Sequence, residues 1–245
     1  MDKTVAIIVA GGNGKRMGLD IKKQYILLKG KEILTRAIEA FEACDFVDEI
    51  IVVVGKEEIN YVQEKIVSHY SLNKVKKVVE GGVERQDSVY NGLVEVDKDT
   101  KYVMIHDGAR PFITKDVIYK CLQKAKQTGA SIIGVPVKDT IKRCDIKSQR
   151  VQDTPKRDTL WIIQTPQIFA FDLLMDAYHY SHEQGLQVTD DSMIVEAFGK
   201  EVYVTKGEYT NIKVTTPEDL MIGEAIIEAI HKKKYSKNVE KSIDL

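Results

Sequence analysis

Three glycines and four cations follow an apolar run near the start of the chain: Gly11, Gly12, Gly14, Lys15, Arg16, Lys22 and Lys23. Glycine has no Cβ and reaches backbone angles that are closed to other residues, so successive N–H groups can converge on anionic oxygens. Lysine and arginine side chains then add full positive charge. The segment therefore predicts a binding site for the phosphates of a nucleotide.

Two better-known glycine signatures do not fit this segment. The P-loop requires serine or threonine after its Gly-Lys pair, but Arg16 follows Gly14-Lys15, so the loop offers no hydroxyl group to a magnesium ion. The dinucleotide-binding fingerprint requires a glycine at position 17, which is Met17. The sequence therefore predicts a phosphate site of another kind.

Five motifs in order connect the chain to a known family. They are residues 10–17 with the pair 23–24, and residues 106–111, 139–143, 164–167 and 211–220. The first resembles the signature of sugar-phosphate and polyol-phosphate nucleotidyltransferases, and the others resemble the 2-C-methyl-D-erythritol 4-phosphate cytidylyltransferases. The resemblance spans roughly residues 4–230. One residue departs from the family's pattern, because the position before Lys23 is commonly proline and is Lys22 here.

The resemblance implies transfer of a cytidylyl group from CTP to 2-C-methyl-D-erythritol 4-phosphate, with release of pyrophosphate. In this reaction the acceptor phosphate attacks the α-phosphorus of CTP, and negative charge gathers at that centre. Neutralising cations matter more than a strong base, because a phosphate monoester is already largely dianionic near neutral pH. We therefore expect two catalytic residues, Lys23 at the α-phosphate and Arg16 towards the β- and γ-phosphates.

The resemblance also implies which residues bind the nucleotide. The expected contacts are Ala10, Gly11, Gly12, Gly14, Gly82, Arg85, Ser88 and Lys213. Lys213 lies between Ile212 and Val214, and a charged side chain in apolar surroundings usually has a partner. Asp107 is the expected ligand of Mg²⁺ or another divalent cation that bridges the triphosphate, since such hard cations prefer oxygen.

A second group of residues is expected to bind the substrates: Asp107, Arg110, Thr140, Arg157 and Thr189. The resemblance places Thr140, Arg157 and Thr189 at the acceptor phosphate, together with Lys213. Arg110 either contacts phosphate or pairs with an acid across the loop. Some of them also have ordinary structural roles open to them. Thr189 suits the N-cap of a helix over 190–198, Thr140 suits a strand, and Arg157 could simply be exposed. We expect His106 to be structural, because neighbours on a strand point to opposite faces and no Gly-x-Ser-x-Gly motif accompanies the His-Asp pair.

Two other functions stay open at this point. Ribitol-5-phosphate cytidylyltransferases are similar in the core, although Gly108-Ala109 and Leu160-Trp161 resemble the first family more closely. A non-catalytic nucleotide-binding protein of the same fold is expected to have lost Arg16, Lys23 or Asp107, and all three are present.

The elements that must position these residues alternate between strands and helices. Short β-branched runs predict strands over 5–10, 49–54, 75–79, 102–106 and 131–137. Apolar residues at helical spacing predict helices over 33–44 and 115–128. Such alternation favours an α/β fold, Rossmann-like, with a mostly parallel sheet sandwiched by helices. Ligands bind beyond the carboxyl ends of the strands in such sheets, where the glycine loop and Asp107 both fall.

Residues 138–160 break this alternation and predict a projecting β-arm. The segment is polar, and only the pieces 139–143 and 150–154 resemble strands. Since the arm has little apolar surface to bury by itself, it either packs on another subunit or moves, and the resemblance implies a homodimer whose arms complete the partner sites.

The last predicted element is a helix that begins at Thr216-Pro217 and runs to about Lys232. We expect one nucleotidyltransferase domain over residues 1–235 and a frayed tail over 236–245.

Composition narrows the partners and the compartment. The formal net charge of −1 over 245 residues offers no bulk attraction to nucleic acid or to an anionic membrane. Cys44, Cys121 and Cys144 are widely spaced, which fits a reducing compartment better than a disulfide framework or a zinc site. Because no apolar run approaches the length of a membrane span, we expect a cytoplasmic protein that binds CTP and a polyol phosphate.

Overall fold

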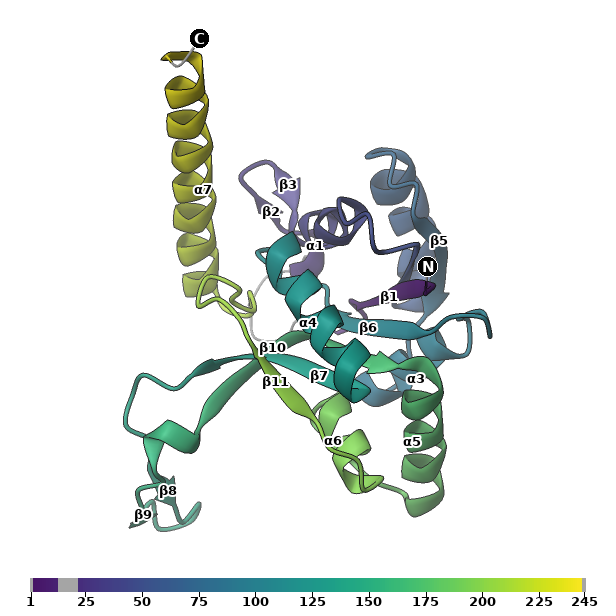
Figure 1. The fold of residues 1–245 in the computed structure, drawn as a ribbon, viewed down its shortest axis with the longest axis vertical. Coiled ribbons are helices and arrows are strands. Elements are labelled where there is room, and N and C mark those ends of the chain that lie inside the picture. The colour runs from purple at the N-terminus through teal and green to yellow at the C-terminus, as the bar shows by residue number, and fades with distance from the viewer. Residues whose placement is uncertain (1, 13–21, 244–245) are drawn as a thin grey trace.

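A mixed sheet of seven strands forms the centre of the fold (Figure 1). A computed structural model describes residues 2–12 and 22–243, with side chains through residue 230 and at residue 232. The strand order is β11-β7-β10-β6-β1-β4-β5. The strands are β1 (Thr4–Val9), β4 (Glu49–Val54), β5 (Val75–Glu80), β6 (Tyr102–Asp107), β7 (Ala130–Pro136), β10 (Trp161–Ala170) and β11 (Tyr203–Lys206).

Most neighbouring strands in this sheet are parallel. β1 pairs in parallel with β4 and β6, β4 with β5, and β7 with β11, whereas β10 is antiparallel to both β6 and β7. The predicted α/β fold is confirmed, and all five predicted strands are present within one residue of their expected ends. The strands β10 and β11 were not predicted.

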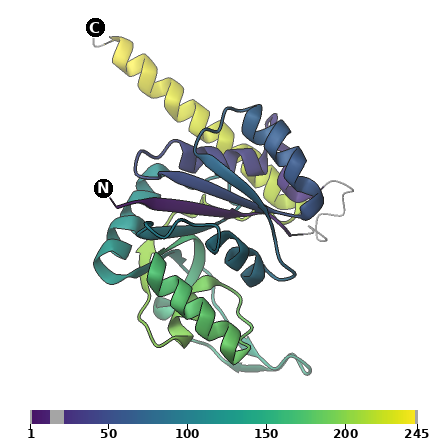
Figure 2. The same ribbon diagram turned by 90° about the vertical axis from the view of Figure 1, so that its right-hand side faces the viewer.

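Helices cover both faces of the sheet (Figure 2). Along β1, Ala6 and Ile8 belong to a core with α1 and α4, while Val5 and Ile7 belong to a second core with α3, α5 and α6. Strands buried on both faces are apolar along nearly their whole length, as β1 and β4 are after their first residues, Thr4 and Glu49. The helices are α1 (Ile33–Glu42), α2 (Ile59–Tyr61), α3 (Arg85–Leu93), α4 (Lys115–Thr128), α5 (Phe171–Gln184), α6 (Asp191–Ala197) and α7 (Pro217–Ile243).

Two helix ends differ from those predicted from the sequence. The predicted N-cap Thr189 is wrong, because Asp190 caps α6 by accepting a hydrogen bond from the Met193 N–H at 3.1 Å. A carboxylate beside a helix N-terminus also interacts favourably with the helix dipole. The last helix, α7, begins at Pro217 as predicted, but it continues to Ile243 instead of ending near Lys232.

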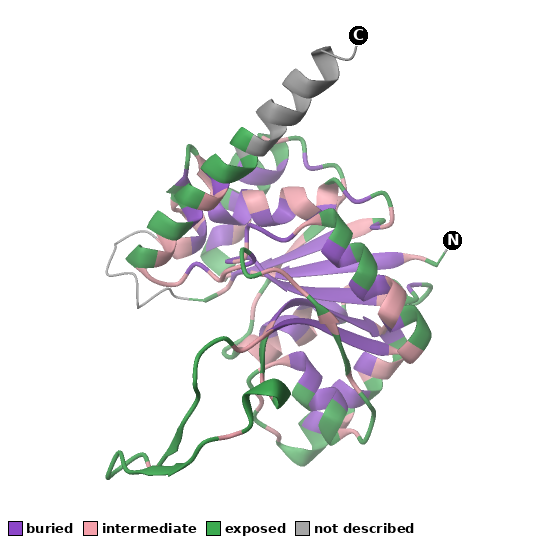
Figure 3. Ribbon diagram, turned by 60° about the vertical axis from the view of Figure 1, so that its left-hand side comes forward, coloured by how far each residue is buried: buried purple, intermediate pink, exposed green. Residues whose placement is uncertain are grey.

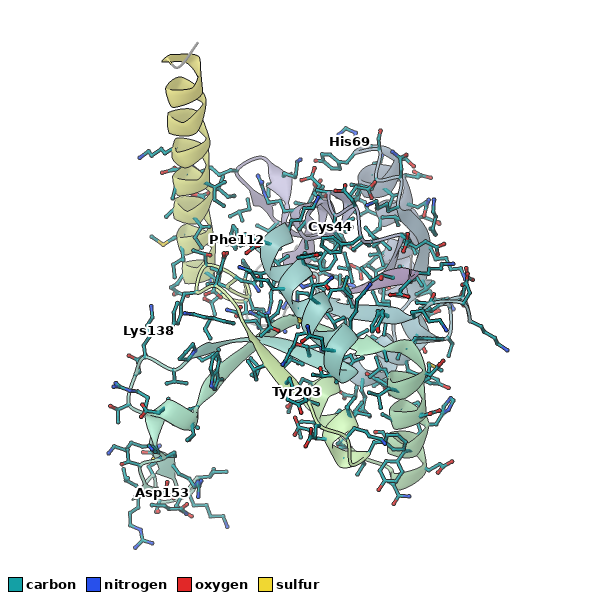
Figure 4. The ribbon with its side chains drawn as sticks, viewed as in Figure 1. Cys44, His69, Phe112, Lys138, Asp153 and Tyr203 are labelled. Carbon is teal, nitrogen blue, oxygen red and sulfur yellow. The ribbon has the colours of Figure 1, made fainter. Side chains whose placement is uncertain are left out.

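The predicted arm is present as a projecting hairpin of β8 (Arg143–Cys144) and β9 (Val151–Asp153). Both strands are shorter than predicted, and almost every residue from 138 to 160 is exposed (Figure 3). Asp153 lies far out on the arm, whereas Lys138 lies where the arm leaves the body (Figure 4). Contact of the arm with a second subunit stays a prediction.

A third apolar cluster joins α7 to the hairpin of β2 (Leu27–Leu28) and β3 (Lys31–Glu32). Val214 belongs to this cluster, and its N–H donates to the Ala109 carbonyl at 2.8 Å. These contacts hold the segment that carries Lys213 against the end of β6. No helix in the described part of the chain is both long and apolar enough to span a membrane.

Candidate active site

A cavity of about 210 Å³ opens beyond the carboxyl ends of β1 and β6. Its lining includes nine of the residues expected at the nucleotide and catalytic site: Ala10, Gly11, Gly12, Lys23, Gly82, Arg85, Ser88, Asp107 and Lys213. Gly14 and Arg16 lie outside the described residues. We call this space the nucleotide cavity.

The glycine loop leaves room for a ligand at the rim of this cavity. A Cβ on Gly12 would meet no atom within 4 Å, and the nearest atom to one on Gly11 would be Ser88 Oγ at 3.7 Å. Neighbouring described atoms therefore do not exclude a side chain at either position. A ligand that approaches the backbone closely would explain both glycines.

A tight turn before α3 forms the facing wall of the nucleotide cavity. The Gly82 N–H donates to Ser88 Oγ at 3.0 Å, and the Ser88 hydroxyl donates to the Glu84 carbonyl at 3.2 Å. A Cβ on Gly82 would lie 2.2 Å from Asp87 Cβ, and a Cβ on Gly81 would lie 2.9 Å from Ser88 Oγ. Here close packing within the protein requires glycine, and the Ser88 hydroxyl holds the turn.

Three cations surround the carboxylate of Asp107. Lys213 Nζ and Arg110 Nε lie 2.8 and 3.5 Å from Oδ2, and Arg85 Nε lies 3.2 Å from Oδ1. Burial of Asp107 opposes its ionisation, but the three cations outweigh burial and hold the pKa of the carboxyl far below its usual range. Lys213 therefore has the partner that its apolar neighbours in the sequence predicted, and the structure identifies that partner as Asp107.

His106 is structural, as predicted. Burial lowers the pKa of His106 to about 4, so the ring is neutral at neutral pH. Because the Arg110 carbonyl can only accept, His106 Nε2–H donates to it at 3.0 Å, and Nδ1 accepts from the Thr165 hydroxyl at 3.0 Å. Thr165 Oγ1 in turn accepts the Asp107 N–H at 3.0 Å. This chain of hydrogen bonds joins β6 to β10 beside the Asp107 carboxylate.

A second cavity, of about 150 Å³, shares Arg85, Asp107 and Lys213 with the first. We call it the acceptor cavity, because it is lined by Thr189, expected at the acceptor phosphate, and by Arg110, expected at a phosphate. Its other lining residues come mainly from β10: Ile163, Gln164, Thr165, Gln167 and Asp190.

Sequence reasoning missed the carboxylate that holds Arg85. Arg85 Nη1 donates to Asp191 Oδ2 at 2.9 Å, and the Tyr178 hydroxyl donates to Asp191 Oδ1 at 2.6 Å. Burial opposes the charge on Arg85, but Asp191 and Asp107 raise the pKa of its guanidinium. The only sequence signal was the polar run Thr189-Asp190-Asp191 before a short helix, which does not reveal a partner about one hundred residues away.

The two arm residues expected at the acceptor phosphate lie elsewhere in this chain. Thr140 and Arg157 are exposed, and Arg157 Nη1 donates to the Lys138 carbonyl at 3.1 Å. Within the described residues of one chain, neither of them lines the nucleotide cavity or the acceptor cavity.

Comparisons with known proteins agree with this geometry. A sequence profile described as 2-C-methyl-D-erythritol 4-phosphate cytidylyltransferase matches residues 4–229. A protein of that name from Alkaliphilus oremlandii (strain OhILAs) is 50% identical over 227 residues, which cover 93% of this chain and 96% of the relative. Another from Clostridium botulinum (strain Langeland / NCTC 10281 / Type F) is 46% identical over 94% of this chain and 100% of the relative. The solved structure of a 4-diphosphocytidyl-2C-methyl-D-erythritol synthase from Anaerococcus prevotii DSM 20548 has a TM-score of 0.82 and 33% identity, and the match covers 93% of this chain and 96% of that one. The chain therefore belongs to the 2-C-methyl-D-erythritol 4-phosphate cytidylyltransferase family.

Proposed function

We propose that the protein transfers a cytidylyl group from CTP to 2-C-methyl-D-erythritol 4-phosphate, which gives 4-diphosphocytidyl-2-C-methyl-D-erythritol and pyrophosphate. This is a step of non-mevalonate isoprenoid synthesis. The two adjoining cavities carry the proposal, because they share a wall made of Arg85, Asp107 and Lys213. A donor site and an acceptor site in contact suit direct group transfer between two bound phosphorylated molecules.

The proposed reaction needs positioned cations more than proton transfer. An oxygen of the acceptor phosphate forms a bond to the α-phosphorus of CTP, and the bond from that phosphorus to the bridging oxygen breaks, so pyrophosphate leaves with the bonding electrons. We place Lys23 at the α-phosphate, and Arg16, which lies outside the described residues, towards the β- and γ-phosphates. Cations held at these places stabilise the charge that grows in the transition state.

A divalent cation such as Mg²⁺ fits the nucleotide cavity as a partner of the triphosphate. Among residues 2–12 and 22–243, no group of three or more His, Cys, Asp or Glu side chains is placed to hold a metal ion. Asp107 offers one carboxylate, and Mg²⁺ commonly takes one or two carboxylates together with substrate phosphates and water. When bound, the ion neutralises part of the triphosphate charge. Asp107 also holds Lys213 and Arg110, so its role is not limited to that of a ligand.

The arm supports a homodimer with shared sites. Thr140 and Arg157 are exposed on a projecting hairpin, and we place them in the acceptor cavity of a partner subunit. Arg157 then adds a cation to an acceptor site built mainly by the other chain. We place the activity in the cytoplasm, where an exposed thiol such as Cys144 stays reduced.

A pyrophosphate-release assay tests the proposal with CTP, UTP or ATP, each combined with 2-C-methyl-D-erythritol 4-phosphate or ribitol 5-phosphate. We expect turnover with CTP and the first acceptor, and loss of turnover in excess EDTA that added Mg²⁺ restores. UTP should be a poor donor, because backbone acceptors at 81–85 that meet the amine of cytosine would oppose the carbonyl of uracil. Preference for ribitol 5-phosphate, or CTP binding without turnover, would contradict the proposal.

A further inference from the structure

Lys22 directly precedes Lys23, but it does not belong to the described lining of the nucleotide cavity. Lys22 Nζ lies 2.8 Å from Glu57 Oε1 and 3.0 Å from Glu58 Oε2. The Glu57 side chain is 72% exposed, and an ion pair so exposed contributes little. The Glu58 side chain is 7% exposed, so solvent and salt screen its attraction for Lys22 much less.

Glu58 contacts the residues on both sides of Lys23. Its Oε2 lies beside Lys22, and its Oε1 accepts from Gln24 Nε2 at 3.3 Å. Gln24 Nε2 also donates to the Ala10 carbonyl at 2.7 Å, at the end of β1. Gln24 and Glu58 are both buried. Glu58 therefore holds the start of the short 3₁₀ helix η2 (Lys23–Tyr25), and Gln24 ties this helix to the start of the glycine loop.

Gly55 leaves the space in which these charges meet. Its N–H donates to Glu58 Oε2 at 2.8 Å. A Cβ at this position would lie 2.5 Å from Glu58 Oε2, 3.1 Å from Glu57 Oε1 and 3.3 Å from Lys22 Nζ. The turn after β4 is thus shaped to accept the ion pair.

The backbone at Lys22 has the conformation of a proline residue. Its φ is −59° and its ψ is 134°, and proline fixes φ near this value. The Lys22 carbonyl accepts the Tyr25 N–H at 3.0 Å, so the conformation at Lys22 sets the start of η2. Proline at this position would hold the same φ through its ring.

We infer that Lys22 is a positioning residue, whose ion pair with Glu58 fixes the backbone that presents Lys23 to the nucleotide. The ion pair replaces the restraint that a proline ring would supply. This inference rests on the proposed function, because it takes Lys23 as the cation at the α-phosphate. A displacement of about 1 Å at such a residue can lower the rate about a hundredfold.

The test compares Lys22→Met, Lys22→Pro, Glu58→Gln and the double variant Lys22→Met/Glu58→Gln by pyrophosphate release, with thermal unfolding to verify that each is folded. Lys22→Met should lower kcat about tenfold or more, since the chain keeps Lys23 but not its restraint. Lys22→Pro should recover most of this loss, and the double variant should be no worse than the poorer single variant. Lys77→Met is the matched control, because Lys77 forms a surface pair with Glu95 at 2.8 Å, and it should not change kcat.

Two results overturn the inference. One is a Lys22→Met variant with the kcat of wild type. The other is a Lys22→Pro variant as slow as Lys22→Met, which would make Lys22 Nζ itself a ligand. A wild-type protein that binds CTP without turnover overturns the proposed function instead. In that case the same variants are compared by their affinity for CTP, measured by calorimetry. Lys22→Met should weaken CTP binding, and Lys22→Pro should restore it.

Discussion

Asp107 sets the positions of three cations in the candidate active site. Its carboxylate contacts Arg85, Arg110 and Lys213, and Asp191 holds Arg85 from the other side. Three positive and two negative side chains leave this cluster with a net charge of +1. Cations fixed by carboxylates need little rearrangement when phosphates bind, which is how a preorganised site lowers a barrier.

Lys23 should contribute chiefly to the transition state. We expect Lys23→Ala to lower kcat by about 10²- to 10⁴-fold while the protein stays folded, because the lost cation stabilises charge that develops on the α-phosphoryl group. Steady-state kinetics at saturating CTP measures the effect, and thermal unfolding verifies the fold. Lys76→Ala removes an exposed lysine outside both cavities and serves as the control. Normal kcat in Lys23→Ala would exclude this role for Lys23.

The three thiols should differ sharply in reactivity. Burial raises the pKa of Cys44 to about 11 and the pKa of Cys121 to about 12, so both are protonated near pH 8 as well as shielded. Cys144 is exposed on the arm. Ellman's reagent at pH 8 should therefore titrate one thiol quickly in the native protein and three in denaturant. Rapid reaction of all three without denaturant would show that the two buried sites open readily.

At the scale of elements, α3 lies unusually close to the sheet at Gly92. A Cβ there would lie 2.6 Å from Ile7 Cγ2 and 3.1 Å from Val53 Cγ2, both on central strands. These methyl groups are attached to branched Cβ atoms and cannot swing aside. In α7, a Cβ on Gly223 would meet the far ends of two side chains, Phe112 Cζ at 3.0 Å and Leu28 Cδ1 at 3.3 Å.

Alanine at these two helical glycines should therefore have different effects. The substitution gains about 1 kcal/mol of helix propensity at either place, but overpacking at Gly92 costs about 1–3 kcal/mol. Gly92→Ala should lower the free energy of unfolding by up to about 2 kcal/mol. At Gly223 the shifts of the Phe112 and Leu28 side chains offset part of the propensity gain, so Gly223→Ala should leave the free energy of unfolding unchanged or raise it by up to about 1 kcal/mol. Urea unfolding of both variants measures the difference. Equal stabilities would mean that β1 and β4 yield to the new methyl group.

Local sequence patterns were sufficient to predict some helices and strands and insufficient to predict others. β1, β4 and β6 each contain an unbroken run of four or five apolar residues, and such short apolar runs predicted them well. β10 was not predicted, because Gln164, Thr165 and Pro166 interrupt its apolar residues. The register of β10 against β7 shifts between Gln164 and Gln167, where these residues lie. The predicted end of α7 was also wrong, because the lysines beyond residue 231 do not stop a helix as proline or glycine would.

The residues of the candidate site also fall into some that the sequence could predict and others that it could not. The residues that the motifs name, such as Lys23, Asp107 and Lys213, lie together in the lining of the nucleotide cavity, and their roles stay predictions. Their supports, Asp191 and Glu58, carry no local signature, because tertiary packing alone brings each of them to its cation. Arg16 lies outside the described residues, so its role stays a prediction.

At the scale of the whole molecule, the arm predicts that activity depends on two chains. If Arg157 completes the partner's acceptor site while Lys23 serves its own chain, Lys23→Ala and Arg157→Ala subunits should rescue each other. In a hybrid dimer one site carries both changes and the other carries neither. With random exchange half of the dimers are hybrid, so activity should return to about a quarter of the wild-type value.

Pyrophosphate release before and after subunit exchange measures this rescue, with exchange verified by two affinity tags. Each variant kept separate is the control and should stay inactive. A mixture that exchanges subunits but gains no activity would place Arg157 in its own chain's site or outside any site.

The reversal of strand direction at β6 and β10 also separates the linings of the two cavities along the chain. The nucleotide cavity draws on β1, the turn before α3, and β6, whereas the acceptor cavity adds, apart from Arg110, residues between 163 and 190. With Thr140 and Arg157 of the arm included, the residues proposed to bind the acceptor alone lie, apart from Arg110, between 140 and 190. A lineage can therefore inherit its nucleotide-loading half unchanged and acquire a new polyol through substitutions in that one continuous stretch of the gene. For protein engineers, the same boundary marks where a graft from a relative could exchange the acceptor and keep the donor.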